Sequence, residues 1–313
     1  YIISGTIILI GTVSLFTNGL NQGIDFSGGR NYIVSFDNKV ETEKLRTLLS
    51  ESFDGEALSV ITIKSNEADK GDNRVRISTN FKISEQSQEI DDEIHTRLYN
   101  GLKPVLGGVS KDEFINKNII SSQKVGPAIA DDIKNSAVWA MILSILGIGL
   151  YIFIRFRNIA FSLGAMFSLA HDAFIIIICY SLFYKIMPFA LEVDQSFVAA
   201  ILTIIGFSVN DTVVIFDRIR EYKGLYPNRP LKELLNDSLN STLGRTFSTS
   251  FTVLLVLLCI LFLGGDVIRG FMFALVVGTV AGSYSTLFLA VPVVFETMIR
   301  GKKKNKKDLG VAK

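Results

Sequence analysis

The sequence predicts a membrane protein: an all-α bundle of six transmembrane helices with one extracytoplasmic α+β domain. Apolar residues make up 49% of the 313 residues and the mean hydropathy is +0.38, which is typical of a chain largely solvated by lipid and argues against a soluble enzyme. Several long apolar runs in the second half approach the roughly 20 residues that a helix needs to cross a bilayer. A stretch of ordinary soluble composition separates them from an apolar N-terminal run.

The N-terminal run, residues 1–17, is interpreted as the first transmembrane helix. It is short for a complete crossing, and Tyr1 stands where an initiator Met would stand, so we expect that this helix is clipped at its N-terminus. No small-residue cleavage site follows the run, which argues against a signal peptide.

Residues 18–134 carry charges throughout, with apolar residues in short alternating groups, and predict one domain outside the bilayer. Ile90, Ile94 and Leu98 form a one-sided stripe that needs a sheet to cover it. The expected elements are strand Asn31–Phe36, helix Glu41–Ser52, strands Leu58–Lys64 and Arg74–Thr79, helix Ser84–Tyr99 and strand Phe114–Val125. This strand, helix, strand, strand, helix, strand order predicts a ferredoxin-like domain.

Residues 135–298 predict a five-helix transmembrane bundle, and residues 299–313 a basic cytoplasmic tail. The apolar runs are Ala137–Ile154, Ile159–Tyr184, Phe197–Phe216, Phe247–Leu263 and Phe271–Phe295. Basic residues gather at 155–157, at 218–232 and in the tail, and the alternate loops are poor in them. Because basic loops stay in the cytoplasm, both termini are predicted to be cytoplasmic and the soluble domain extracytoplasmic.

Ionisable residues inside the apolar runs are the candidate functional residues. Asp211 lies near the cytoplasmic end of the fourth span, where a carboxylate is costly unless it is neutral, paired or hydrated. Arg245 lies at a similar depth on the next span, with Thr249 one turn deeper on the same face, so an Asp211–Arg245 pair is geometrically reasonable. The competing interpretation of Asp211 is a static ion pair or a packing hydrogen bond.

His171 and Asp172 fall near the middle of the third span and predict a second, deeper polar centre. The competing interpretation is that these two side chains only hydrogen-bond to a neighbouring helix. Gly278 and Gly282 form a small-residue ridge that is more typical of helix packing than of a partner site.

Other classes of function find no support in the sequence. It contains no Walker motif, and its two cysteines, Cys179 and Cys259, lie in apolar runs and suggest neither a disulfide framework nor a zinc site. The net charge of +2 gives no indication of nucleic acid binding. We therefore expect no enzymatic activity, no cofactor and no metal.

Four segments resemble one family closely: the SecF subunits of the bacterial SecDF protein-export complex, within the resistance-nodulation-division superfamily. The segments are Gly23–Gly29 after the first span, Val125–Pro127 before the second, Asn210–Glu221 leaving the fourth and Asn240–Thr246 entering the fifth. The resemblance covers essentially the whole chain. It implies an inner-membrane location and partnership with SecD, the SecYEG channel, YajC and a translocating preprotein.

By this resemblance, Asp211 and Arg245 match intramembrane residues assigned to proton passage, and Thr249 matches a supporting polar position. The implied function is that of an auxiliary translocase subunit that uses the proton motive force to promote polypeptide export. The alternatives are a non-conducting scaffold of the translocase and a small-molecule or lipid exporter of the same superfamily. The coupling ion is expected to be H⁺, with Na⁺ as the alternative, because a carboxylate with nearby hydroxyls can serve either ion.

Overall fold

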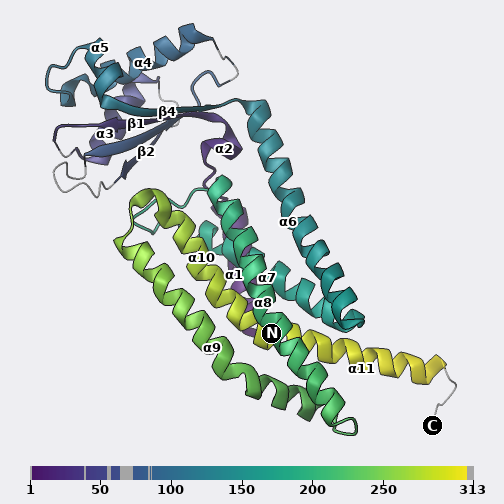
Figure 1. Cartoon of the computed structure of the whole chain (residues 1–313). Helices are drawn as coiled ribbons and strands as arrows, with labels where there is room; N and C mark the ends of the chain where they lie inside the picture. The colour runs from purple at the N-terminus through teal and green to yellow at the C-terminus, as the bar shows by residue number, and fades with distance from the viewer. Residues whose placement is uncertain are drawn as a thin grey trace.

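A computed structural model describes residues 2–38, 40–54, 58–63, 73–83, 85 and 87–308, and it has two parts: a small α+β domain and a long helical bundle (Figure 1). The domain lies beyond one end of the bundle, and α11 projects sideways from the opposite end. Tyr1, Lys64 and Ser84, and the tail residues 309–313, all used above, lie outside the described residues.

The soluble domain is built on a four-stranded sheet of β1 (Gly29–Ser35), β2 (Leu58–Ile63), β3 (Arg74–Thr79) and β4 (Ile119–Val125). The strand order is β2-β3-β1-β4, and every neighbouring pair is antiparallel. Helices α3 (Thr42–Ser52) and α4 (Gln88–Leu102) supply the buried partners of one sheet face. Ile90, Ile94 and Leu98 of α4 are at most 5% exposed, so the predicted stripe is the buried face of this helix.

The last predicted strand is shorter than expected and begins at Ile119 rather than at Phe114. Residues Phe114–Asn118 form a π-helical turn that follows the short helix α5 (Lys111–Glu113), and only Ile119–Val125 is strand. The Ser110 hydroxyl accepts the Glu113 amide at 3.3 Å and starts the helical turn, and Phe114 is fully buried in the core of the domain. Local capping therefore overrides the alternating pattern read from the sequence.

Two glycines turn the chain from the first helix into the sheet. After α1 (Ile2–Thr17) and the short helix α2 (Ile24–Ser27), Gly28 has φ +72° and Gly29 has φ +135°. A Cβ at Gly29 would lie 2.7 Å from the Asn80 Oδ1 atom and 2.9 Å from the Thr79 carbonyl oxygen. Both the backbone conformation and the close approach to β3 therefore require glycine.

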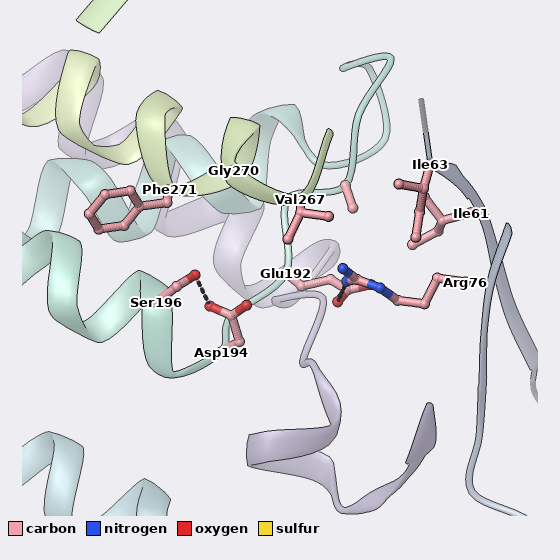
Figure 2. Close-up of a pocket in the computed structure, with 10 residues that line it drawn as sticks. Ile61, Ile63, Arg76, Glu192, Asp194, Ser196, Val267, Gly270 and Phe271 are labelled. Carbon is pink, nitrogen blue, oxygen red and sulfur yellow. Dashed lines mark hydrogen bonds and ion pairs between the residues drawn. The ribbon is translucent and has the colours of Figure 1, made fainter. Parts of the chain in front are cut away.

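The domain contacts the bundle through the loop between α7 and α8. The Gly23 amide donates to the Val193 carbonyl at 3.0 Å, and the Val193 amide donates to the Asn21 carbonyl at 2.8 Å. In Figure 2 the side chains of Arg76 on β3 and Glu192 in the loop point toward one another, and they form an ion pair at 3.4 Å. We call this region, between the sheet and the loop, the junction.

The bundle consists of α1, α6 (Pro127–Phe156), α7 (Ile159–Phe183), α8 (Gln195–Leu225), α9 (Leu231–Leu263) and a long last helix. The last helix comprises α10 (Asp266–Ser285), the π-helical segment η3 (Thr286–Ala290) and α11 (Val291–Asp308). Among the described residues, five helices are long and apolar enough to cross a membrane, and α1, with 16 residues, is apolar but shorter.

The helices extend beyond the apolar runs that predicted them. Helix α6 starts at Pro127, α8 continues to Leu225 and α9 starts at Leu231, well before Phe247. Pro at the first helical position suits a helix start, and Asp194 caps α8 by accepting the Phe197 amide at 2.9 Å. The apolar pattern predicts only the part of each helix that suits lipid.

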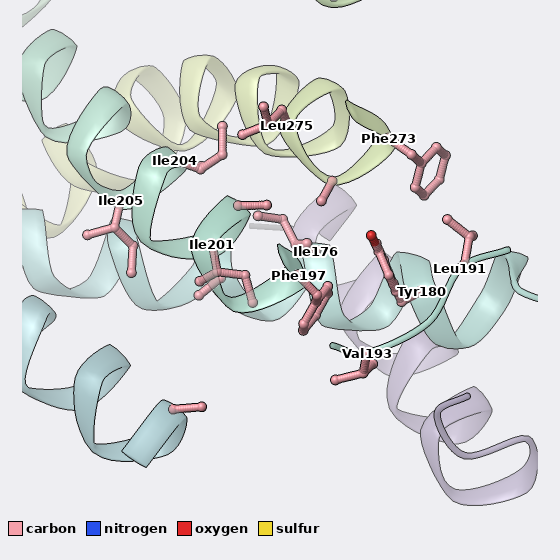
Figure 3. Packing of buried hydrophobic residues seen from close by; sticks show 14 of the residues in the cluster. Ile176, Tyr180, Leu191, Val193, Phe197, Ile201, Ile204, Ile205, Phe273 and Leu275 are labelled. Carbon is pink, nitrogen blue, oxygen red and sulfur yellow. The ribbon is translucent and has the colours of Figure 1, made fainter. Parts of the chain in front are cut away.

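Helices α7, α8 and α10 form the centre of the bundle (Figure 3). Their contact is apolar near the soluble domain, where Tyr180 and Phe197 pack with ring centroids 4.4 Å apart. The cluster drawn in Figure 3 also includes Ile176, Leu191, Val193, Ile201, Ile204, Ile205, Phe273 and Leu275. Helices α6 and α9 pack at the outside, and most of their apolar side chains are uncovered in this chain.

Candidate functional site

Polar side chains from α7, α8, α9 and the last helix meet inside the apolar bundle. We call this group the polar layer. Its members are each at most 9% exposed, except Ser283, which is half-buried. They are His171, Asp172, Ser208, Asp211, Thr212, Thr246, Ser250, Thr279, Ser283 and Thr286.

Asp211 lies between α8 and α9 and is 6% exposed. The Ser250 hydroxyl of α9 donates to the Asp211 Oδ2 atom at 3.4 Å, and the Ser283 hydroxyl of α10 donates to the Ser250 Oγ atom at 2.7 Å. These contacts join three helices through one carboxyl group and two hydroxyls. Such a chain can hold or pass a proton, because each hydroxyl can both donate and accept.

Arg245 and Thr249 do not contact Asp211 in this arrangement. Both are exposed on α9, and the Thr249 hydroxyl donates to the Arg245 carbonyl of its own helix at 2.6 Å. No salt bridge joins Asp211 and Arg245 in the described part of the chain. Arg245 instead lines a cavity of about 370 Å³ between α8 and α9, together with Asp217, Arg218 and Glu221.

His171 and Asp172 form the second polar centre. The His171 Nδ1 atom lies 3.2 Å from the Asp172 Oδ1 atom, and the Ser208 hydroxyl of α8 donates to Asp172 Oδ2 at 2.7 Å. Asp172 is completely buried. The other ring nitrogen of His171, Nε2, is buried without a hydrogen-bond partner among the described residues and lines a cavity of about 520 Å³ beside α1.

The last helix lies against both centres at adjacent residues. A Cβ at Gly282 would lie 3.1 Å from Ser208 Oγ and 3.5 Å from Asp172 Oδ2, whereas Ser283 bonds to Ser250 on the Asp211 side. One turn further on, the hydroxyls of Thr212 and Thr286 are 3.1 Å apart. Thr286 opens the π-helical segment η3, and π-helical turns within α-helices occur frequently at functional sites.

Two flanks of α9 are uncovered at the depth of this layer. Phe247 is 71% exposed on one flank, and Arg245 and Thr249 are exposed on the other, roughly half a turn away. A cavity of about 530 Å³ opens between α9 and α10 and reaches Ser250 and Ser283. Charged and hydroxyl groups facing lipid at this depth are costly, so this surface requires a cover.

The two carboxylates and the histidine are predicted from the sequence, but the hydroxyls that contact them are not. Ser208, Ser250, Thr212, Ser283 and Thr286 emerge only from the structure. A signal was available, since Ser and Thr recur at helical spacing at 208 and 212, at 246 and 250, and at 279, 283 and 286. Among the described residues, no group of three or more His, Cys, Asp or Glu side chains could hold a metal ion.

Comparisons with known proteins converge on one family. Residues 107–300 match the family described as "Protein export membrane protein SecD/SecF, C-terminal", and residues 13–40 match the SecD/SecF GG motif. The protein translocase subunit SecF of Rhodothermus marinus is 40% identical over 300 residues, which cover 96% of this chain and 91% of the relative. SecF of Sebaldella termitidis is 34% identical and is covered to 95%.

Solved structures give the same result. The crystal structure of SecDF, a translocon-associated membrane protein from Thermus thermophilus, matches 94% of this chain with a TM-score of 0.75 and 31% sequence identity. This chain covers 37% of that SecDF chain. A SecDF structure in a super-membrane-facing form matches with a TM-score of 0.63.

Proposed function

The chain belongs to the SecD/SecF family of protein-export membrane proteins, and we propose that it is an auxiliary subunit of the Sec translocase which, with SecD, uses the proton motive force to promote polypeptide export. The observation that carries the proposal is Asp211, a carboxyl group buried in a membrane bundle and contacted by a hydroxyl rather than by a cation. Ionisable groups inside membranes commonly mark ion pathways.

Proton passage needs two arrangements of this site. In the arrangement described here, Arg245 forms no ion pair with Asp211, and the Ser250 hydroxyl can contact a protonated or a charged carboxyl group. Movement of Arg245 toward Asp211 would stabilise the carboxylate and release the proton. Each proton that crosses contributes about 2.3 kcal/mol per 100 mV to a motion coupled to it. His171 and Asp172 would form a second, deeper station of the same pathway, and Thr249 a supporting polar position beside Arg245.

SecD is the proposed cover of the exposed α9 surface. This surface carries Arg245 and Thr249, which are too polar to face lipid. The matching SecDF protein of Thermus thermophilus is a chain of which this one covers 37%, which supports pairing with a second unit. The SecYEG channel, YajC and the translocating preprotein are proposed as further partners from family membership alone.

The proposed topology has six spans in the inner membrane, both termini in the cytoplasm and residues 18–134 outside. Helix α1 would be the first span, residues 135–298 the remaining five and residues 299–313 a basic tail. The basic residues at 155–157 and 218–232 support this orientation. We also propose a ferredoxin-like outer domain, which the strand order β2-β3-β1-β4 supports. H⁺ is the proposed coupling ion, with Na⁺ as the alternative.

The test substitutes Asp211→Asn, which keeps size and hydrogen bonding but removes titration. A preprotein is arrested part-way into membrane vesicles, and its completion is measured with and without an imposed proton gradient. We expect the gradient-dependent completion to be lost while ATP-driven initiation continues. Asp217 lies nearly two turns further along α8 and is about half exposed. Asp217→Asn is therefore the matched control and should behave as wild type.

Complex abundance is checked in each case, so that failed assembly is not mistaken for failed coupling. Asp211→Asn vesicles that assemble normally and complete export at the wild-type rate would refute proton carriage and favour the scaffold function. Repeating the assay with a sodium gradient distinguishes the two ions.

A further inference from the structure

The junction between the soluble domain and the bundle encloses charged groups. A cavity of about 210 Å³ separates the open face of the sheet from the outer ends of the bundle helices. Arg76 and Glu192 meet across it with side chains 20% and 11% exposed (Figure 2). On the neighbouring side, Ile61 and Ile63 of β2 approach Val267 at the start of α10 around a narrower space. Sheet and bundle therefore touch through both apolar and ionic groups.

Among the described residues that line this cavity, the charges do not balance. Three carboxylates, those of Asp25 on α2 and of Glu192 and Asp194 in the loop, share the cavity with one guanidinium group, that of Arg76 on β3. The described lining residue from α10 is Val267, which is uncharged. Asp194 accepts from the Phe197 amide and the Ser196 hydroxyl, and Asp25 accepts from the Gln195 amide at 3.1 Å. In the described part of the chain, the Glu192 side chain hydrogen-bonds to Arg76, which donates at 3.4 Å.

Besides this contact, two connections of the chain join the domain to the bundle. One runs from α1 through residues 18–23, and the other is the turn at Gly126 between β4 and α6. Separation of the sheet from the loop would break the Arg76–Glu192 pair and expose Glu192 to water, with both connections intact.

We propose that the junction is a proton-sensitive dock, in which the soluble domain is held against the bundle most firmly when Glu192 is protonated and is released when Glu192 is ionised. A neutral Glu192 still hydrogen-bonds to Arg76, and Arg76 then faces the two remaining carboxylates. An ionised Glu192 adds a third negative charge beside Asp25 and Asp194. The dock concerns a different site from the polar layer and stands independently of proton passage at Asp211.

The electrostatics of Glu192 have the sign that this dock requires. Burial raises the pKa of Glu192 above its ordinary value of 4.5; Arg76 opposes the rise, and Asp194 and Asp25 add to it. A carboxyl group whose pKa is higher in the docked than in the separated arrangement binds its proton preferentially when docked. Docking therefore strengthens as the pH falls toward the raised pKa and weakens as the pH rises through it.

The test measures the distance between the soluble domain and the bundle by double electron–electron resonance in the purified full-length chain. Spin labels are placed at Glu89→Cys on α4 and at Ile186→Cys in the loop after α7, both exposed positions, after Cys179 and Cys259 are replaced by alanine. We expect the short-distance population to be at least about threefold larger at about pH 5 than at about pH 8.

Glu192→Gln, neutral at every pH, should stay docked and lose this response. Arg76→Gln should keep the response and lower the docked population at about pH 8 by a further threefold or so. Glu113→Gln removes an exposed carboxylate paired with Lys117 far from the junction, and it should respond as wild type. Equal populations at both pH values in the wild type, or a wild-type response in Glu192→Gln, would overturn the proposal. If Glu192→Gln does not fold, the Arg76→Gln protein provides the test: docked populations equal to those of the wild type would overturn the proposal.

Discussion

Close packing of the last helix on the bundle centre gives a graded prediction for glycine substitutions. A Cβ at Gly278 would lie 2.5 Å from the Ile204 Cγ1 atom and 2.9 Å from the Ile176 Cδ1 atom. At Gly282, one turn along, the nearest atoms are Ser208 Cβ and Oγ, both at 3.1 Å. At Gly206 on α8, nothing lies within 4 Å.

Two opposing terms set the magnitude. Alanine in place of glycine inside a helix stabilises by about 1 kcal/mol, whereas an extra methyl group in a packed core costs about 1–3 kcal/mol. Gly206→Ala should therefore stabilise the protein by up to about 1 kcal/mol. Gly282→Ala should come close to zero, because its neighbours need to move by only a few tenths of an ångström. Gly278→Ala should destabilise by about 1–2 kcal/mol, since two isoleucines would have to shift.

The assay is thermal aggregation of the purified chain in detergent, followed by size-exclusion chromatography. A difference of 1 kcal/mol corresponds to a shift of roughly 1.5 °C in the midpoint for a protein of this size. We expect the midpoints to rank Gly206→Ala above Gly282→Ala and Gly282→Ala above Gly278→Ala. A Gly278→Ala protein as stable as Gly206→Ala would refute the packing of α10 on α7 and α8 described here.

Three further predictions concern the site, the soluble domain and the topology. Ser250→Ala removes the hydroxyl that donates to Asp211 and should slow gradient-dependent export by about 5–10-fold. Thr249→Ala should change the rate by less than about twofold, because its hydroxyl bonds within α9. The reverse order of the two effects would contradict the geometry. Burial lowers the pKa of His95 below 6.5, so the unfolded chain binds a proton at His95 more readily than the folded domain does. Protease resistance of the soluble domain should therefore fall as the pH drops below about 6.5. His95→Gln should remove this pH dependence, and an unchanged pH profile in that variant would contradict the prediction. In a chain with Cys179 and Cys259 replaced by alanine, Glu89→Cys should react in intact cells with an impermeant thiol reagent and Asn228→Cys should not; the opposite labelling would invert the topology.

The sequence predicts the centres of the helices better than their ends. Apolar runs of membrane length leave few alternatives to a helix, because unpaired backbone groups are too costly in lipid. Beyond the lipid, α8 continues to Leu225 and α9 begins at Leu231, over polar residues that show no apolar run. Similarly, Phe114 reads as part of a strand, but it lies in a helical turn whose start is set by the Ser110 cap.

For the site, the sequence indicates which residues are out of place in lipid but not which ones meet. Asp211 and Asp172 stand out because carboxylates are rare in apolar runs. Their partners depend on how each helix is rotated about its axis. Arg245 and Thr249 share one face of α9, but Thr246 and Ser250 share the face that is buried against α8 and α10. Two such faces, both rich in hydroxyls, cannot be distinguished by spacing alone.

The arrangement of the last helix explains why two polar centres on different helices need not act separately. Gly282 packs on Ser208 and Asp172, and the next residue, Ser283, bonds to Ser250 beside Asp211. Because adjacent residues of one helix move together, a rotation or shift of α10 that alters one contact must alter the other. The π-helical segment η3 follows directly, and Gly164 of α7 approaches its Ala290 carbonyl so closely that a Cβ would lie 2.8 Å away. Movement of α10 would therefore change the surroundings of Asp172 and Asp211 in a single step.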